Sequence, residues 1–361
     1  MSASQYFSAT YAEARERFLA AATAAGATIK SRTNPNKGPD GGTLSTDMAW
    51  FGPRDPERAL VLVSGTHGVE GFCGSGAQVG WIEGGGPSRL PAGMGVLVIH
   101  AINPHGFAWL RRVTEDNVDL NRNFIDFAKP LPQSPAYDEI AAAVCPKDWS
   151  DAGRAAADKV LDAYAAKHGQ FGLQAAISGG QYKYADGLFY GGKGPTWSRR
   201  TLFDFTERHL GRARQVALID FHTGLGPYGH GELICPHPVE SPITSRSEAW
   251  FGKEMTVPAR GNSSSAVIVG TLGQGLQTAL PRTEVTDIGL EYGTQPPKDV
   301  ISALRADNWL HLHGDLNSAQ GRDIKRKIRD AFYQDHDDWK DMILARALDV
   351  IGRTADNLAK V

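Results

Sequence analysis

Glycines surround a histidine and a glutamate that follow an apolar run of the sequence, residues 59–65. The segment reads His67-Gly68-Val69-Glu70. A tight turn at the carboxyl end of a strand can aim an imidazole nitrogen and a carboxylate oxygen at one point, and zinc takes such ligands near 2 Å. The pattern therefore predicts that His67 and Glu70 bind a metal ion.

The same spacing occurs a second time in the chain, at His237 and Glu240. This second pair is interleaved with prolines and follows no comparable strand end flanked by glycines. We interpret it as a surface loop, because a histidine and a glutamate at this spacing are a weak signal by themselves.

A catalytic zinc ion needs three protein ligands and one open position for water, so the first pair requires a distant partner. His222 ends the apolar run 215–224, and α/β proteins bind ligands at the carboxyl edge of the sheet. Asp220 would lie on the same face of the strand and could support the site through a hydrogen bond. His222 is the predicted third ligand; the alternative is a histidine packed in the core.

Further motifs follow in a characteristic order. They are Asn-Pro-His-Gly at 103–106, the pair Arg111-Arg112, Asp-Leu-Asn-Arg-Asn-Phe at 119–124 and Asp-Phe-His-Thr at 220–223. With the first His-Glu pair, they resemble the zinc carboxypeptidase superfamily, which includes carboxypeptidase A, the succinylglutamate desuccinylases and the aspartoacylases. More narrowly, the chain is similar to a bacterial branch of carboxypeptidase-like proteins. The resemblance spans about residues 55–295.

This resemblance implies a role for a glutamate late in the chain. Glu291 matches by position the general base of the family, within the apolar segment 287–293. Strand alternation would put Glu291 on the face opposite Leu290 and Tyr292, where flanking glycines leave room for water and substrate. From the residues alone, Glu284 and Asp287 are nearby rivals.

Arginines suit substrate binding because a planar guanidinium stays charged and can grip a carboxylate with two hydrogen bonds. The resemblance implies that Asn121 and Arg122 hold the substrate carboxylate. It also implies that Arg111 or Arg112 polarises the scissile carbonyl, with a slight preference for Arg112. The tyrosine that closes the family's site stays open among Tyr182, Tyr184, Tyr190, Tyr228 and Tyr292.

The elements that must position these residues are visible as apolar runs. Strands are expected at 59–65, 94–103, 215–224, 265–270 and 287–293, with helices at 9–25 and 151–167 among others. Runs that are apolar throughout indicate strands buried on both faces. The fold class is therefore α/β, with a mixed, mainly parallel central sheet and helices on both faces. The resemblance makes this the zinc carboxypeptidase-like, phosphorylase/hydrolase-like architecture.

The 361 residues are expected to form one catalytic domain, 1–361. An insertion is predicted around 126–200, where the strand signal fades, and it could flank or cover a site. The tail 321–361 places apolar residues at helical spacing among charges and predicts one or two amphipathic helices that pack on the core.

Composition restricts the partners. A net charge of −2 gives no electrostatic footprint for nucleic acid, and no long apolar segment indicates a membrane span or a signal peptide, so we expect a cytoplasmic protein. The three cysteines, Cys73, Cys145 and Cys235, are too few for a disulfide framework and are expected to be buried as small apolar residues.

The sequence thus favours a zinc-dependent hydrolase that cleaves an amide or peptide bond next to a carboxylate in a small peptide. A deacylase of N-acyl amino acids, similar to aspartoacylase or the desuccinylases, is the closest alternative. A non-catalytic zinc-binding sensor on the same scaffold is a third. The side-chain preference, the oligomeric state and the native metal stay open.

Overall fold

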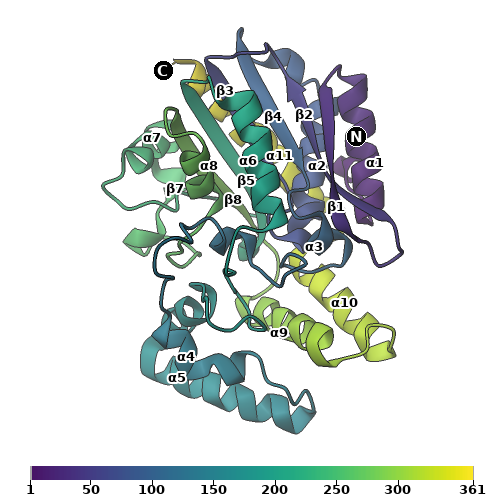
Figure 1. The fold of residues 1–361 in the computed structure, drawn as a ribbon, viewed down its shortest axis with the longest axis vertical. Helices are drawn as coiled ribbons and strands as arrows, with labels where there is room; N and C mark the ends of the chain where they lie inside the picture. The colour runs from purple at the N-terminus through teal and green to yellow at the C-terminus, as the bar shows by residue number, and fades with distance from the viewer. Residues whose placement is uncertain (1, 361) are drawn as a thin grey trace.

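A computed structural model describes residues 2–360 of the chain. Its centre is an eight-stranded sheet with the order β1-β2-β4-β3-β5-β8-β6-β7 (Figure 1). The strands are β1 (Thr28–Lys37), β2 (Thr43–Phe51), β3 (Arg58–Val63), β4 (Met94–His100), β5 (Gln215–Tyr228), β6 (Gly231–Ile234), β7 (Met255–Thr256) and β8 (Glu284–Gly293).

The four central strands β4, β3, β5 and β8 are parallel to one another, and β1, β2 and β6 add antiparallel pairs. Four of the five predicted strands correspond to these central strands. The hairpin β1–β2 was not predicted, because β1 is an edge strand whose polar side chains are largely exposed and lack an apolar pattern.

Helices cover both faces of the sheet (Figure 1). Alternate strand residues such as Leu60 and Leu62 pack with α1 (Tyr11–Ala24), α2 (Gly71–Glu83) and α11 (Asp337–Lys360). Their neighbours, such as Val61, pack on the other face with α6 (Trp197–Leu210) and α8 (Leu272–Ala279). The predicted α/β class, with a mixed and mainly parallel sheet, is confirmed.

Residues 126–200 form a helical layer at one end of the sheet. α4 (Pro135–Val144) and α5 (Asp151–Ser178) lie there beside α9 (Pro297–His313) and α10 (Ala319–Phe332) (Figure 1). α5 changes direction at Gly169, whose φ of 78° suits a residue without a side chain. The helix predicted at 151–167 is present and continues beyond this break. The remaining α-helices of residues 2–360 are α3 (Pro104–Ala108) and α7 (Pro242–Phe251).

The tail folds as the two predicted amphipathic helices, α10 and α11. The apolar positions that indicated them are buried, and they are Ile324, Ile328, Phe332, Trp339, Ile343 and Ile351. α11 packs on α2 across one face of the sheet, so the tail completes the core.

The strand predicted at 265–270 is wrong. These residues form an irregular loop, in which Val267 and Val269 are exposed while Ala266 is buried. Alternating exposure imitates a strand pattern here without a sheet neighbour. The loop ends at Gly270, where φ is +83° and an added Cβ would lie 2.6 Å from the carbonyl oxygen of Arg122.

Within residues 2–360, no helix combines the length and apolar composition that a membrane crossing requires. Cys73 and Cys235 are buried, Cys145 is partly buried, and all three are free thiols.

Candidate metal centre

The first His-Glu pair lies at the carboxyl end of β3. The chain leaves the strand after Val63 and turns through a short 3-10 helix, Gly68–Glu70, into α2. Gly68 is needed at this turn, because an added Cβ would lie 2.1 Å from the carbonyl carbon of Gly106. The close approach holds the turn against α3 and directs His67 and Glu70 to the same side.

His222, on β5, meets this pair. One potential ligand atom from each of His67, Glu70 and His222 lies within 4.8 Å of the other two. The two imidazole ring centres are 5.0 Å apart, and all three side chains are buried. The structure thus brings together two nitrogen donors and one carboxylate from remote parts of the chain, a donor set that zinc accepts.

The state of His67 suits a metal ligand. Its Nε2 lies 2.7 Å from Nη2 of Arg112, and since arginine can only donate, Nε2 must be an unprotonated acceptor. Its Nδ1 is buried without a hydrogen-bond partner in residues 2–360, with Asp119 Oδ1 at 3.5 Å. Burial, and then the charge of Arg112, lower the pKa of His67 well below its usual value. In a neutral ring the proton is then on Nδ1, on the side of Asp119, and the lone pair of Nε2 is the one that a cation could take.

Glu70 and His222 are fixed by several contacts. Oε2 of Glu70 accepts a hydrogen bond from the backbone N–H of Thr223 at 3.0 Å and lies 3.1 Å from Nδ1 of His222. On the other side of the ring, Nε2 of His222 lies 2.8 Å from Oδ2 of Asp220. Burial opposes a charge on His222, but Asp220 and Glu70 together raise its pKa well above the usual value. Asp220 therefore stands where a supporting carboxylate was predicted.

The two adjacent arginines point in different directions. Arg112 donates to Oε1 of Glu70 at 2.9 Å and to Oδ2 of Asp119 at 3.0 Å, and it lines the cavity. Burial opposes its charge, but Asp119 and Glu70 raise the pKa of Arg112, so the guanidinium stays charged. Arg111 is directed away and pairs with Asp307 at 3.2 Å. Of the two candidates, the structure brings Arg112 to the site and leaves Arg111 outside it.

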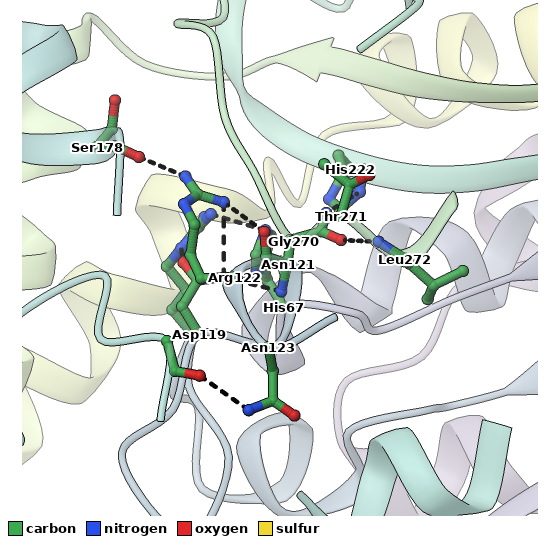
Figure 2. A network of polar contacts seen from close by, with 12 residues as sticks. His67, Asp119, Asn121, Arg122, Asn123, Ser178, His222, Gly270, Thr271 and Leu272 are labelled. Carbon is green, nitrogen blue, oxygen red and sulfur yellow. Dashed lines mark hydrogen bonds and ion pairs between the residues drawn. The ribbon is translucent and has the colours of Figure 1, made fainter. Parts of the chain in front are cut away.

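Asn121 and Arg122 lie in a 3-10 turn, Leu120–Arg122, close to His67 and His222 (Figure 2). Oδ1 of Asn121 accepts from the backbone N–H of Leu272 at 2.7 Å, and its Nδ2 lies 3.3 Å from Nε2 of His222. Arg122 donates to the backbone oxygens of Asn121 and Ser178. Its Nε is buried with no hydrogen-bond partner within the described residues. Arg122 thus has a free donor, whereas the oxygen of Asn121 is already used.

Glu291 lies on β8 directly beside His222 of β5 in the parallel register. It is buried at the cavity wall and accepts a hydrogen bond from the backbone N–H of Leu225 at 3.0 Å. Burial, and then the charge of Glu70, raise the pKa of Glu291 to about 8. Its rival Glu284 is exposed at the start of the strand and pairs with Arg246 at 3.2 Å.

One cavity of about 140 Å³ is lined by several of these groups: His67, Arg112, Asn121, Arg122, His222 and Glu291. Residues 126–200 contribute Gln174, Ser178 and Phe189 to its wall, so this segment flanks the site. The ring of Phe189 lies under both cavity arginines, with centroid distances of 5.1 Å to Arg112 and 5.6 Å to Arg122. Sequence reasoning missed Phe189, since a phenylalanine in a glycine-rich loop carries no signal of its own.

Asp119 is a second residue to which no role was given from the sequence. It is fully buried, and although burial opposes its ionisation, Arg112, His67 and Arg122 lower its pKa. It stands inside the motif at 119–124, so the signal was present. The carboxylate provides the negative charge that keeps two buried arginines side by side.

The second His-Glu pair is not the surface loop that we expected. Glu240 is exposed, but His237 is buried, with Nε2 at 2.6 Å from Oδ1 of Asp287. Asp287, a rival of Glu291, is thus the partner of a buried imidazole. The interpretation failed because prolines around a residue fix the backbone but do not indicate where its side chain points.

Two of the candidate tyrosines have clear positions. Tyr182 donates its hydroxyl hydrogen to the backbone oxygen of Arg122 at 2.6 Å, next to the cavity. Tyr292 is buried on the opposite face of the sheet, where its hydroxyl donates to the backbone oxygen of Ile343. Tyr292 therefore cannot reach the site.

Comparison with known proteins gives a family and a set of distant folds. The family described as "Protein of unknown function (DUF2817)" matches residues 7–346. The chain is similar to carboxypeptidase A from Helicoverpa armigera, at 12% identity and a TM-score of 0.47, covering 90% of this chain and 74% of that one.

Two further solved structures each share 17% identity and a TM-score of 0.37 with the chain. The similarity to murein-tripeptide amidase from Escherichia coli O157 covers 84% of this chain and 95% of the amidase chain. The similarity to an aspartoacylase family protein from Mesorhizobium loti covers 81% of this chain and 68% of that protein's chain. The search of curated proteins found no match. A carboxypeptidase A and an aspartoacylase family protein are thus among the solved structures to which the chain is similar.

Proposed function

The chain belongs to the DUF2817 family, and from the geometry of its site we propose that it is a zinc-dependent hydrolase. It would cleave an amide or peptide bond next to a carboxylate in a small substrate. The observation that carries this proposal is the convergence of His67, Glu70 and His222 within 4.8 Å at the wall of a cavity that also contains Glu291 and two arginines.

His67, Glu70 and His222 would hold the ion. When bound, zinc supplies a positive charge that acidifies water and polarises a carbonyl group. The hydrogen bond from Thr223 to Glu70 and the contact of Asp220 with His222 keep two of the three side chains in place. Such supporting partners orient ligands and raise their basicity.

Glu291 is the residue we assign to proton transfer. Its carboxylate lies beside His222 on the neighbouring strand, and its one hydrogen bond, from Leu225, leaves the other oxygen available. A carboxylate in this place can accept the proton of the attacking water and deliver it to the leaving amine. The absence of a side chain at Gly289, the preceding residue on the same face, leaves room for the substrate.

Arg112 and Arg122 would bind the negative groups of the substrate. Arg112 is nearer to the proposed ligands and would stabilise the developing oxyanion. Arg122, with its unsatisfied Nε, would hold the carboxylate next to the scissile bond. The hydrogen bond from Leu272 to Oδ1 fixes the amide of Asn121, and its Nδ2 would be the donor that helps Arg122 to hold this carboxylate.

The test is turnover by zinc-loaded and chelator-treated protein on a panel of short peptides and N-acyl amino acids. We expect hydrolysis that depends on zinc and is lost in Glu291→Gln, while zinc content measured by elemental analysis is unchanged. Glu284→Gln is the matched control, since it removes an exposed carboxylate from the same strand. Cleavage of the acyl group alone would select the deacylase. Stoichiometric zinc without turnover on either class would refute the hydrolase and favour the sensor.

A further inference from the structure

We propose that Asp287 forms the floor of a subsite that binds a positively charged side chain of the substrate. The inference rests on the proposed function, because it places the subsite beside the bond to be cleaved. Three observations support it: the pattern of residues on one face of β8, the contacts of the buried Asp287 carboxylate, and the apolar residues that line the cavity above it.

The sheet face under the cavity has a regular pattern. In the parallel register His222 lies beside Glu291, Asp220 beside Gly289 and Leu218 beside Asp287. Asp287, Gly289 and Glu291 alternate along β8, so they share one face, and all three line the cavity. At about 3.3 Å per residue, Asp287 lies roughly 13 Å below Glu291. On this face of the strand, Gly289 leaves no side chain between the two carboxylates.

The gap at Gly289 is real space. A Cβ added to Gly289 would meet nothing closer than Ile234, at 3.8 Å, which is ordinary contact distance. Ile234 is the residue opposite Gly289 on β6. The site therefore continues over Gly289 toward Asp287 instead of ending below Glu291.

Asp287 has one oxygen available to a ligand. Its side chain is 4% exposed, and Oδ1 contacts Nε2 of His237 at 2.6 Å and accepts from Nε2 of Gln277 at 3.0 Å. Within residues 2–360 both of these contacts are made to Oδ1, and Oδ2 packs against Gly273, where an added Cβ would come within 1.9 Å of it; Asp287 and Gly273 both line the cavity. A buried carboxylate oxygen without a donor favours a ligand that brings one.

Arg246, beside the start of the same strand, makes its hydrogen bonds elsewhere. Arg246 donates to Thr286, to the backbone oxygen of Val285 and to Glu284, at the start of β8. His237 contacts Oδ1. We therefore assign a positive partner of Oδ2 to the substrate.

The walls of the subsite are apolar. They are formed by Leu218, Ile234, Ala266, Ile268 and Leu272. An apolar channel that ends in a carboxylate matches a side chain with a methylene stem and a cationic tip. Lysine and arginine have this form, and the cavity arginines at the other end would hold the carboxylate of the same residue. The substrate class is thus an amide or peptide in which a basic residue flanks the scissile bond.

Binding of free amino acids to the zinc-loaded protein tests the subsite without relying on turnover. L-arginine, L-citrulline and L-norleucine have similar stems and differ at the tip. By calorimetry, L-arginine should bind about tenfold or more tightly than L-citrulline, the smallest difference expected for a hydrogen bond between charged groups. Equal affinities would overturn the proposal.

Variants assign the effect to Asp287. Asp287→Asn keeps the size of the side chain and should abolish the preference for L-arginine, whereas the control Glu284→Gln should retain it. If Asp287→Asn does not fold, Gly289→Val, which fills the gap above Asp287, should abolish the preference instead. A preference that survives both substitutions, or that Glu284→Gln also removes, contradicts the subsite.

Turnover separates this inference from the proposed hydrolase. Zinc-dependent cleavage of substrates with leucine or norleucine beside the scissile bond, without preference for arginine, would leave the hydrolase intact and refute the subsite. L-arginine binding that depends on Asp287, without any turnover, would support the subsite and refute the hydrolase.

Discussion

His67–Glu70 and His237–Glu240 share one spacing but lie in different surroundings. The first pair turns both side chains toward His222, while the second is divided between the interior and the surface. The first pair follows the end of a central parallel strand, where a turn made possible by Gly68 faces the neighbouring strand ends. The second follows the short strand β6, and its histidine turns down to Asp287.

The comparison teaches that spacing selects which residues could act together, whereas the path of the backbone decides which do. His222 and His237 each contact a carboxylate on the same face of the sheet. The carboxylate is Asp220 for His222 and Asp287 for His237. The difference lies in what else arrives. His222 meets a second imidazole and a second carboxylate, and His237 meets the amide of Gln277.

Alanine at a predicted ligand should give the largest contrast. We expect His222→Ala to lose stoichiometric zinc and to lower turnover by more than about 100-fold, because changing only a supporting partner already costs about 10- to 100-fold. His237→Ala should keep its zinc, although it breaks a buried pair. Elemental analysis and turnover on one substrate measure both. Zinc loss in His237→Ala alone would reverse the comparison.

Arg111 and Arg112 give a second comparison, between a residue outside the site and its neighbour that lines the cavity. Arg112→Gln should lower turnover by about 100-fold or more, the usual effect of removing one oxyanion donor, with zinc retained. Arg111→Gln should leave turnover per folded molecule near the wild-type value and lower the free energy of unfolding by about 1.5 kcal/mol, because Asp307 loses one buried charged partner but keeps Lys325. Kinetics and urea denaturation separate the two effects. Equal kinetic losses would refute the assignment of Arg112.

The two aspartates that contact histidines provide a finer test. Asp220→Asn should weaken zinc binding by about 10- to 100-fold, because the carboxylate supports a proposed ligand. Asp287→Asn should leave zinc affinity unchanged, since its imidazole partner is not one of the proposed ligands. Competition with a chromophoric chelator gives both dissociation constants. A similar loss in Asp287→Asn would mean that the two pairs act on the same ion.

The smallest effect is expected at the exposed end of the second pair. Glu240→Gln should change the free energy of unfolding by less than about 0.5 kcal/mol, as for most surface substitutions, and should not affect zinc content or turnover. Glu70→Gln, at the equivalent place in the first pair, is the comparison. Thermal unfolding and elemental analysis would show whether the glutamates differ as their burial indicates.

Much of the fold could be predicted because its central strands are buried on both faces. The runs that became β3, β4 and β5 are almost continuously apolar before their carboxyl ends, whereas β8 alternates apolar residues with Asp287, Gly289 and Glu291. The hairpin β1–β2 and the loop at 265–270 could not be predicted correctly. Their patterns depend on sheet neighbours, which exist for β1 and do not exist for the loop.

The sequence by itself determined the chemical types of the candidate site: imidazoles and carboxylates after apolar strands, and arginines in a motif that spacing makes recognisable. Tertiary structure decided which of them face one another. It separated Arg112 from Arg111, turned His237 inward and brought Phe189 under both cavity arginines. The reason is physical, because side-chain direction at a turn depends on close backbone contacts with distant segments, such as Gly68 against Gly106, which local sequence does not encode.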